Sequence, residues 1–112
     1  MKKIEAIIRP EKFTIVKDAL SVLGYPGMTV TKVTGHGNQK GITEIWRGRS
    51  FRVDLLSKIK IEIVARDADV EKIVNTIISE SRTGSIGDGK IFVFDVVNVY
   101  RIRTNESGDV AV

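Results

Sequence analysis

The stretch TGSIGDGK, from Thr83 to Lys90, holds three glycines and ends on a lysine. Successive backbone amides in such a loop can turn toward one anion, and a lysine at the rim adds a positive charge. The same residues also suit a plain connection, in which Gly84 caps a helix and the run from Gly87 to Gly89 makes a tight turn. It is not a Walker motif, because that motif leads into a helix and this loop leads into a strand pattern. On the pattern alone, the plain turn is the stronger interpretation.

Other residues that could do chemistry are few. A second glycine-rich segment, GHGNQKG, carries Gln39 and Lys40, and its His36 is the only histidine of the chain. One histidine, no cysteine and no clustered carboxylates give no pattern for a metal site, and no serine lies in a nucleophile motif. Arg101 and Arg103 alternate along a run that we expect to be extended, so they point the same way and suit a polyphosphate, although solvated arginines are the ordinary alternative. The sequence therefore favours a binding protein over an enzyme.

The composition is that of an ordinary globular domain. The chain has 112 residues, of which 42% are hydrophobic and 29% charged, and its formal net charge is +4. This mild excess is not by itself a nucleic-acid signature. No apolar run approaches the roughly 20 residues that a membrane helix needs, and the N-terminus lacks a signal-peptide pattern. We expect one cytoplasmic domain over residues 1–112.

The hydrophobic pattern predicts two similar halves, each a strand, a helix and a strand. Strands alternate apolar and polar residues, whereas the helices repeat apolar residues three and four apart. The order βαββαβ suits a ferredoxin-like α+β sandwich, an antiparallel sheet with both helices on one face. The predicted strands cover 2–9, 28–35, 58–64 and 90–100, and the predicted helices cover 13–23 and 67–81.

One face of such a sheet has no helix on it. The pattern places on that face, toward solvent or another subunit, Glu5, Ile7, Lys58, Lys60 and Glu62. Phe92 and Phe94 share one face of the last strand, and we expect both to fill the core beneath the helices.

Two segments show neither the alternation of apolar residues expected for a strand nor the spacing of three and four expected for a helix. Residues 35–57 contain four glycines without a sustained apolar stripe, and they are too many for an ordinary hairpin connection of about 2–5 residues. Such a segment is usually functional or disordered. Near the C-terminus, RIRT at 101–104 extends or re-forms a strand, and we expect residues 105–112 to be a mobile tail.

Taken together, these segments resemble the PII nitrogen-regulatory signalling family. The resemblance runs from KKIEAIIRPEK through GMTV and QKG to TGSIGDGKIFVFDV and RIRT. It implies a homotrimer of ferredoxin-like subunits whose clefts bind ATP or ADP, and 2-oxoglutarate together with Mg-ATP. Residues 37–55 resemble the family's T-loop, 82–90 its B-loop and 101–112 its C-terminal segment.

The resemblance also assigns roles by position. Gly87, Gly89 and Lys90 would hold the phosphates, which answers the ambiguity of TGSIGDGK in favour of an anion. Arg101 and Arg103 would reach those phosphates from the adjacent subunit. The implied nucleotide site comprises Thr29, Gly35, Gly37, Gln39, Glu62, Val64, Gly87, Gly89, Lys90, Arg101 and Arg103.

A 2-oxoglutarate site is implied beside the nucleotide. Gln39 would help to hold Mg²⁺ and the diacid, and Lys58 would pair with a carboxylate of 2-oxoglutarate. The full implied set is Gln39, Lys40, Gly41, Lys58 and Gly87.

The segment 37–55 departs from the family at several positions. Phe51 replaces the tyrosine that receives a nucleotidyl group in many relatives, and without a hydroxyl we expect no modification there. Arg49 stands where some relatives carry a phosphorylated serine, and Asn38 where many carry arginine. For target binding the resemblance points to Arg47, which in some relatives enters the mouth of an ammonium transporter, with Trp46 and Phe51 as aromatic contacts.

The leading interpretation is a non-catalytic nitrogen-regulatory sensor. Its ligands would shift the conformation of residues 37–55, which control an ammonium transporter or a nitrogen-metabolism enzyme. The alternative is a divergent PII-like nucleotide sensor with another effector, outside nitrogen control. A nucleic-acid binder would need exposed aromatics at strand centres, and a weak ATPase would need a placed catalytic base. We expect neither a nucleic-acid partner nor enzymatic activity.

Overall fold

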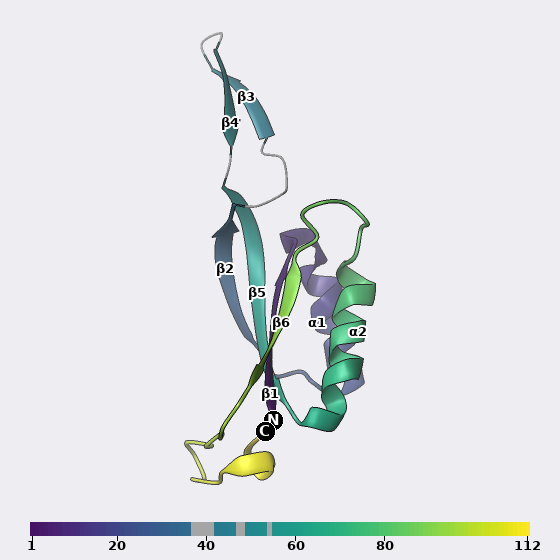
Figure 1. Ribbon diagram of the computed structural model, residues 1–112, viewed down its shortest axis with the longest axis vertical. Coiled ribbons are helices and arrows are strands. Elements are labelled where there is room, and N and C mark those ends of the chain that lie inside the picture. Colours follow the sequence, from purple (N-terminus) through teal and green to yellow (C-terminus); the bar gives the residue numbers. More distant parts are fainter. Residues whose placement is uncertain (37–41, 47–48, 54) are drawn as a thin grey trace.

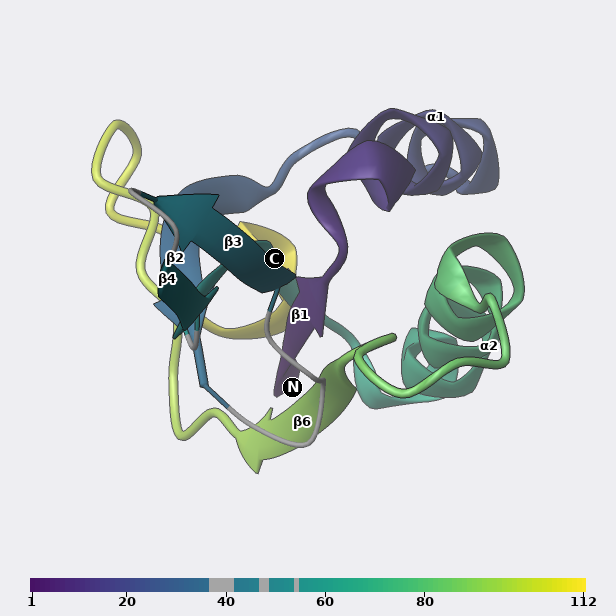
Figure 2. The same ribbon diagram turned by 90° about the horizontal axis from the view of Figure 1, so that it is seen from above.

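The computed structural model describes residues 1–36, 42–46, 49–53 and 55–112, with the backbone alone for 42–46 and 49–53. Four strands form one antiparallel sheet in the order β2-β5-β1-β6. The two helices, α1 (Phe13–Leu23) and α2 (Val70–Ser81), lie side by side on one face of this sheet, as Figures 1 and 2 show. The strands are β1 (Lys2–Ile8), β2 (Thr29–Gly35), β5 (Leu56–Ala65) and β6 (Lys90–Asp95). The predicted ferredoxin-like fold is confirmed.

The core lies between the sheet and the helices. Alternation places Ile4, Ala6 and Ile8 of β1 against the helices, and the same alternation operates in β5. From the helices, the residues three and four apart that the sequence predicted reach this layer. The buried cluster consists of Ile4, Ala6, Ile8, Val16, Leu20, Ile59, Ile61, Ile63, Ala65, Ile73 and Ile77.

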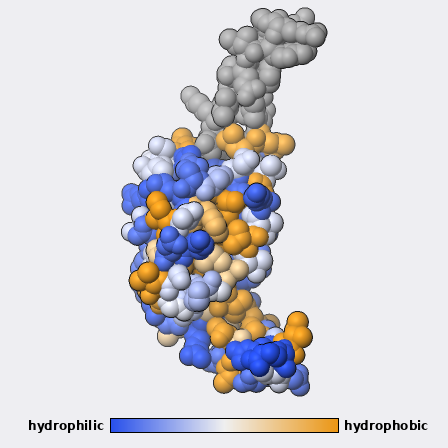
Figure 3. Space-filling view, turned by 180° about the vertical axis from the view of Figure 1, so that it is seen from behind, coloured by the Kyte–Doolittle hydropathy of each residue, from blue (hydrophilic) through white to orange (hydrophobic). Residues whose placement is uncertain are grey.

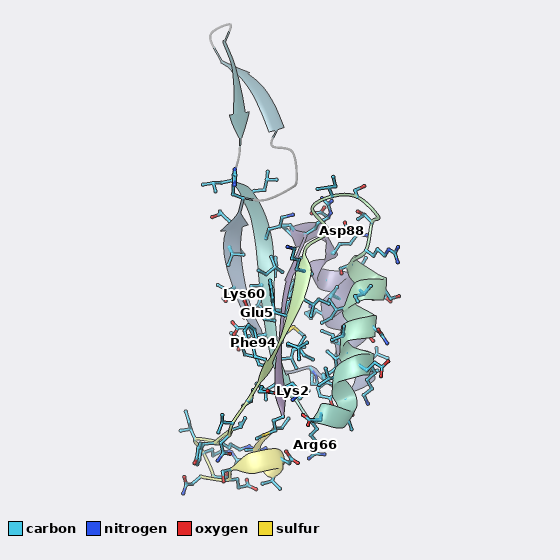
Figure 4. The ribbon with its side chains drawn as sticks, viewed as in Figure 1. Lys2, Glu5, Lys60, Arg66, Asp88 and Phe94 are labelled. Carbon is cyan, nitrogen blue, oxygen red and sulfur yellow. The ribbon has the colours of Figure 1, made fainter. Side chains whose placement is uncertain are left out.

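The opposite face of the sheet carries charged ladders. Glu5 pairs across the strands with Glu62, and Ile7 with Lys60, so these residues lie on the helix-free face as predicted. Lys3 joins them, with its Nζ 3.4 Å from a Glu62 carboxylate oxygen. Figure 4 shows Glu5 and Lys60 on the sheet strands, away from the helices.

The prediction for Phe92 and Phe94 is wrong. Their register partners on β1 are Glu5 and Lys3, so both rings lie on the helix-free face, where they are 43% and 45% exposed. The Lys3 ammonium stands 5.0 Å from the centre of the Phe94 ring. The intervening residues Ile91 and Val93 are on the helix side of β6, opposite Ala6 and Ile4 of the core. Ile91 packs against the core, whereas Val93 is 48% exposed on this edge strand. The sequence predicted the strand correctly, but it assigned Phe92 and Phe94 to the wrong face of that strand.

Residues 35–57 contain structure that the sequence did not predict. Strands β3 (Ile42–Trp46) and β4 (Arg49–Val53) pair antiparallel as a separate two-stranded ribbon, from Ile42 opposite Val53 to Trp46 opposite Arg49. Figure 1 shows this ribbon beyond the upper ends of β2 and β5. Residues 35–57 show no sustained alternation of apolar and polar residues, so the sequence pattern did not indicate these two strands.

The C-terminal part is also more structured than expected. Strand β6 ends at Asp95, RIRT forms a turn in place of a strand, and the chain returns so that Tyr100 bridges Ser107. Residues Gly108–Ala111 form a 3-10 turn, and Arg66 donates a hydrogen bond to the Asp109 carbonyl at 3.3 Å. The expected mobile tail is thus folded against the end of β5. Among the described residues, no helix is long and apolar enough to cross a bilayer.

Candidate anion and effector site

The loop from Thr83 to Gly89 is organised around the carboxylate of Asp88. Its oxygens accept hydrogen bonds from the amides of Thr83 and Gly84, each at 2.9 Å, and from the Thr83 hydroxyl. These bonds, led by that of the Thr83 hydroxyl, hold the pKa of Asp88 well below its ordinary value. The loop therefore closes on its own carboxylate, which is negatively charged at neutral pH. Figure 4 shows Asp88 in this loop, between α2 and β6.

Three successive amides of the same loop are left over. Within the described part of the chain, no hydrogen bond is made by the backbone N–H groups of Ile86, Gly87 and Asp88. Unpaired amides in series, in a loop of glycines with positive φ, are the elements of an anion nest.

Gly89 cannot carry a side chain. Its φ is +103°, and a Cβ at this position would lie 1.7 Å from the carbonyl oxygen of Ile7. The backbone of the loop thus packs directly against the end of β1. This close approach fixes where the loop enters β6.

Two cations tie the loop to the sheet. Arg9, just beyond β1, donates from Nε to Asp88 at 3.0 Å and from Nη2 to the Ile86 carbonyl at 2.9 Å. Lys58, on β5, donates from Nζ to the Gly87 carbonyl at 2.7 Å. Burial lowers the pKa of Lys58, and the Arg9 guanidinium lowers it further, against the opposing charges of Glu11 and Asp88.

Lys58 and the loop border a hollow of about 720 Å³ at one end of the sheet. Its floor comes from β1, β5 and β6, and its wall comes from the loop. The lining residues are Ile7, Gly35, His36, Leu56, Lys58, Ser85, Ile86, Gly87, Asp88, Gly89, Lys90 and Phe92. The hollow combines lysines, unpaired amides and an apolar floor, which is the composition that a phosphorylated or carboxylated small molecule requires.

Comparison with known proteins shows the family. The profile described as "Nitrogen regulatory protein P-II" matches residues 1–106. The chain belongs to the nitrogen regulatory protein P-II family. It is 60% identical over 112 residues to nitrogen regulatory protein P-II 2 of Methanothermobacter thermautotrophicus, an alignment that covers 100% of this chain and 97% of that protein. It is 57% identical to nitrogen regulatory protein P-II of Klebsiella oxytoca and to P-II 1 of Escherichia coli, with 100% of both chains covered in each case.

This P-II chain brings part of the predicted site together. One hollow contains residues from the end of β2, from β5 and from the loop before β6. They are Gly35, Lys58, Gly87, Gly89 and Lys90.

Other predicted residues lie elsewhere in the same chain. Thr29 and Glu62 are register partners six positions along the ladder from Gly35, which is about 20 Å at strand spacing. Val64 lies further along β5. Arg101 and Arg103 belong to the C-terminal turn, at the opposite end of the molecule from the loop (Figure 1). Arg101 there pairs with Glu106 at 2.9 Å, and the turn does not keep the two arginines alternating along a strand as predicted.

Several predicted positions lie outside the described residues. These are Gly37, Gln39, Lys40, Gly41 and Arg47. Trp46 and Phe51 are placed by their backbones on β3 and β4.

Sequence analysis missed the residues that shape the loop. Arg9 and Ile7 were assigned only to a strand, and Asp88 only to a turn. A signal was present, because an aspartate between two glycines is well suited to accept amide hydrogen bonds from its own loop. No local signal could have linked Arg9 to Asp88, because the two residues are 79 positions apart.

Proposed function

We propose that this P-II family chain is a non-catalytic nitrogen-regulatory sensor that binds ATP or ADP and, together with Mg-ATP, 2-oxoglutarate. Its family membership supports the regulatory role, and the hollow at the end of the sheet supports a small anionic ligand. The phosphates would lie against the unpaired amides of the loop from Ile86 to Asp88, with Lys90 at its rim. The adenosine would meet Thr29, Glu62 and Val64 of a neighbouring copy, because in the same chain these residues lie about 20 Å or more along the ladder from Gly35.

One observation carries this proposal. The lysine expected to pair with 2-oxoglutarate and a glycine expected to hold phosphate are joined by a hydrogen bond, from Lys58 Nζ to the Gly87 carbonyl at 2.7 Å. The two groups come from elements 29 residues apart in sequence. A diacid held by Lys58 and a phosphate held at Gly87 would therefore be adjacent, as joint binding through one Mg²⁺ requires.

A homotrimer is part of the proposal. Arg101 and Arg103 lie at the far end of the chain from the loop, so they can reach its phosphates only from a neighbouring copy. The helix-free sheet face offers Phe92 and Phe94 to such a neighbour, beside the charged ladder of Glu5 and Glu62. On the C-terminal segment, Val97 and Ile102 are 98% and 100% exposed, and Figure 3 shows hydrophobic side chains beside hydrophilic ones at this lower end of the molecule.

The same face bears on the nucleic-acid alternative. Exposed Phe92 and Phe94 have the location that base stacking needs. However, the neighbouring Glu5 and Glu62 carboxylates neutralise the lysines of this face and would repel a phosphate backbone. We therefore favour burial against a second copy and propose no nucleic-acid partner.

Signalling would pass through residues 37–55. We propose that Gln39 links bound Mg²⁺ and 2-oxoglutarate to this segment, and that Trp46, Arg47 and Phe51 contact the target. The target is an ammonium transporter or an enzyme of nitrogen metabolism. A ligand controls this contact only through unequal affinity for two conformations of the segment.

Calorimetry tests the ligands. The purified protein is titrated with Mg-ATP, and then with 2-oxoglutarate in the presence and in the absence of Mg-ATP. Binding of Mg-ATP, and of 2-oxoglutarate only when Mg-ATP is present, is the expected result. Binding of Mg-ATP without any response to 2-oxoglutarate would favour a divergent sensor with another effector. No binding of nucleotide at all would refute the proposed function.

Sedimentation tests the assembly. A species of three times the chain mass is expected at micromolar concentration, and a monomer would contradict the role given to Arg101 and Arg103. Trp46 is the only tryptophan, so its fluorescence in the same samples reports whether ligands alter its surroundings.

A further inference from the structure

The ion pair between Arg9 and Asp88 is the centre of the loop's hydrogen-bond network. Asp88 accepts from Thr83 and Gly84 on one side and from Arg9 on the other, and Arg9 also donates to the Ile86 carbonyl. The Arg9 and Asp88 side chains are 14% and 24% exposed, so solvent competes little for them. The guanidinium thereby spans the loop, since it contacts the residues on both sides of Gly87.

Every partner in this network is a group of the chain itself. A loop with three glycines would otherwise lose much backbone freedom when it closes on an anion, and that loss would weaken binding. A loop that its own fold has already ordered avoids most of this cost when the ligand arrives. Of the three amides that have no partner among the described residues, those of Gly87 and Asp88 lie along the chain between the two contacts of Arg9, and that of Ile86 directly precedes them.

We infer that Arg9 and Asp88 are positioning residues for the anion site, and that their ion pair holds the loop in its ligand-binding shape before a polyphosphate binds. The inference rests on the proposed nucleotide function and adds residues that the family resemblance did not supply. Neither residue needs to contact the ligand, because both act on it through the loop backbone.

Charge and position predict opposite effects for Asp88. Removing a carboxylate beside an anion site should strengthen anion binding if only Coulomb repulsion changes. If Asp88 positions the loop, Asp88→Asn should weaken binding instead. An amide has one acceptor oxygen, and its NH₂ group would meet donors of Thr83 or Arg9. The sign of the change therefore separates the two explanations.

The binding experiment measures the Kd of Mg-ATP by calorimetry for the full-length protein and three variants. We expect Asp88→Asn and Arg9→Gln each to raise Kd by about ten-fold or more, as is usual when a charge-assisted hydrogen bond is lost. Arg82→Gln is the matched control. Arg82 directly precedes Thr83, is exposed, and contributes only its backbone amide to the hydrogen bonds among described residues. Its replacement removes the same positive charge as Arg9→Gln and should change Kd by less than about two-fold.

A second experiment needs no ligand. Amide hydrogen exchange by NMR should show Thr83 and Gly84 protected in the wild type, because Asp88 accepts from both amides. Protection should fall at both positions in Arg9→Gln and Asp88→Asn, while buried amides of β1 and β5 keep theirs, which shows that the variants are folded.

The outcomes separate this inference from the proposed function. Tighter or unchanged Mg-ATP binding in Asp88→Asn, or unchanged exchange at Thr83 and Gly84 in Arg9→Gln, would overturn the positioning role. If the wild type itself binds no nucleotide, the proposed function fails. The positioning role for an anion site then fails with it, whereas the exchange data still report whether the ion pair orders the loop.

Discussion

Lys58 Nζ lies 2.7 Å from the carbonyl oxygen of Gly87, so a central strand of the sheet and the glycine-rich loop share a hydrogen bond at the rim of the hollow. In this structure the lysine ammonium holds a backbone oxygen. A diacid that pairs with Lys58 would compete with this contact or share it. The loop proposed to hold phosphate and the lysine proposed to pair with 2-oxoglutarate are therefore joined by a direct hydrogen bond.

Replacing Lys58 should weaken the binding of 2-oxoglutarate far more than the binding of Mg-ATP. In Lys58→Met we expect 2-oxoglutarate binding to fall by about 100-fold or more, because a buried carboxylate would lose its cation. Mg-ATP should bind no more than about ten-fold more weakly. Calorimetry measures both. Lys32→Met is the control, because Lys32 lies on neighbouring β2 opposite Ile59 and on the other face of the sheet. An equal loss of both ligands in Lys58→Met would place the lysine among the phosphate contacts instead.

Gly89→Ala should destabilise the fold strongly. The new Cβ would overlap the Ile7 carbonyl oxygen at a φ of +103°, so β1 and the loop must move apart. We expect a loss on the order of 3 kcal/mol and a fall in the apparent Tm of about 10 °C or more. Gly84→Ala is the matched control. Its φ is +87° but nothing lies within 4 Å of the added Cβ, and it should cost about 1 kcal/mol. Similar Tm values for the two variants would contradict the close packing at Gly89.

Asp88 should contribute to stability in a pH-dependent way. Its pKa is lower in the folded state than its ordinary value of 3.8. The stabilisation is therefore fully present above pH 3.8 and is lost as the pH falls through the folded-state pKa. Thermal unfolding of the wild type and of Asp88→Asn should differ most near neutral pH, and the two curves should converge in acid. Asp18→Asn, at an exposed carboxylate of α1, should follow the wild type at every pH. A gap between wild type and Asp88→Asn that widens in acid would contradict the direction of the shift.

Arg47→Ala should uncouple target binding from ligand binding. Arg47 lies outside the described residues, and its expected role comes from the family resemblance. We expect capture of the target to be lost, with the Kd of Mg-ATP within about two-fold of the wild type. Pull-down with the transporter or enzyme and calorimetry on the same preparation make the comparison. A parallel loss of nucleotide affinity would place Arg47 in the nucleotide site.

The sheet and helices could be predicted because burial imposes a period on the sequence. Ile59, Ile61 and Ile63 alternate since one face of β5 meets the helices, and Val16 and Leu20 are spaced for the same core. Phe92 and Phe94 show the limit of this reasoning. Alternation identifies two sets of residues on a strand, but apolar residues in both sets leave open which set faces inward. On β6 the smaller Ile91 and Val93 are opposite the core residues of β1.

The candidate site was only partly predictable. Glycines and a lysine in TGSIGDGK indicated a loop that could hold an anion, but composition could not decide between that loop and a plain turn. The deciding contacts come from Arg9 and Lys58, which lie far from the loop in sequence, and no local pattern encodes such contacts. The ribbon of β3 and β4 was not predicted either, because residues 35–57 show no sustained alternation of apolar and polar residues.

The position of β5 has a consequence for how a signal could travel. This strand is bonded along both edges, to β1 and to β2, and it carries Lys58 close to the residues that lead into the β3–β4 ribbon. A shift of β5 along its axis would break the hydrogen bonds of both ladders, so we expect this strand to stay fixed relative to its neighbours. Under the proposed function, a bound ligand would therefore act on the chain beyond the last paired residues of this ladder, Gly35 and Leu56. The boundary between the rigid and the switching parts of the chain is therefore expected at that pair.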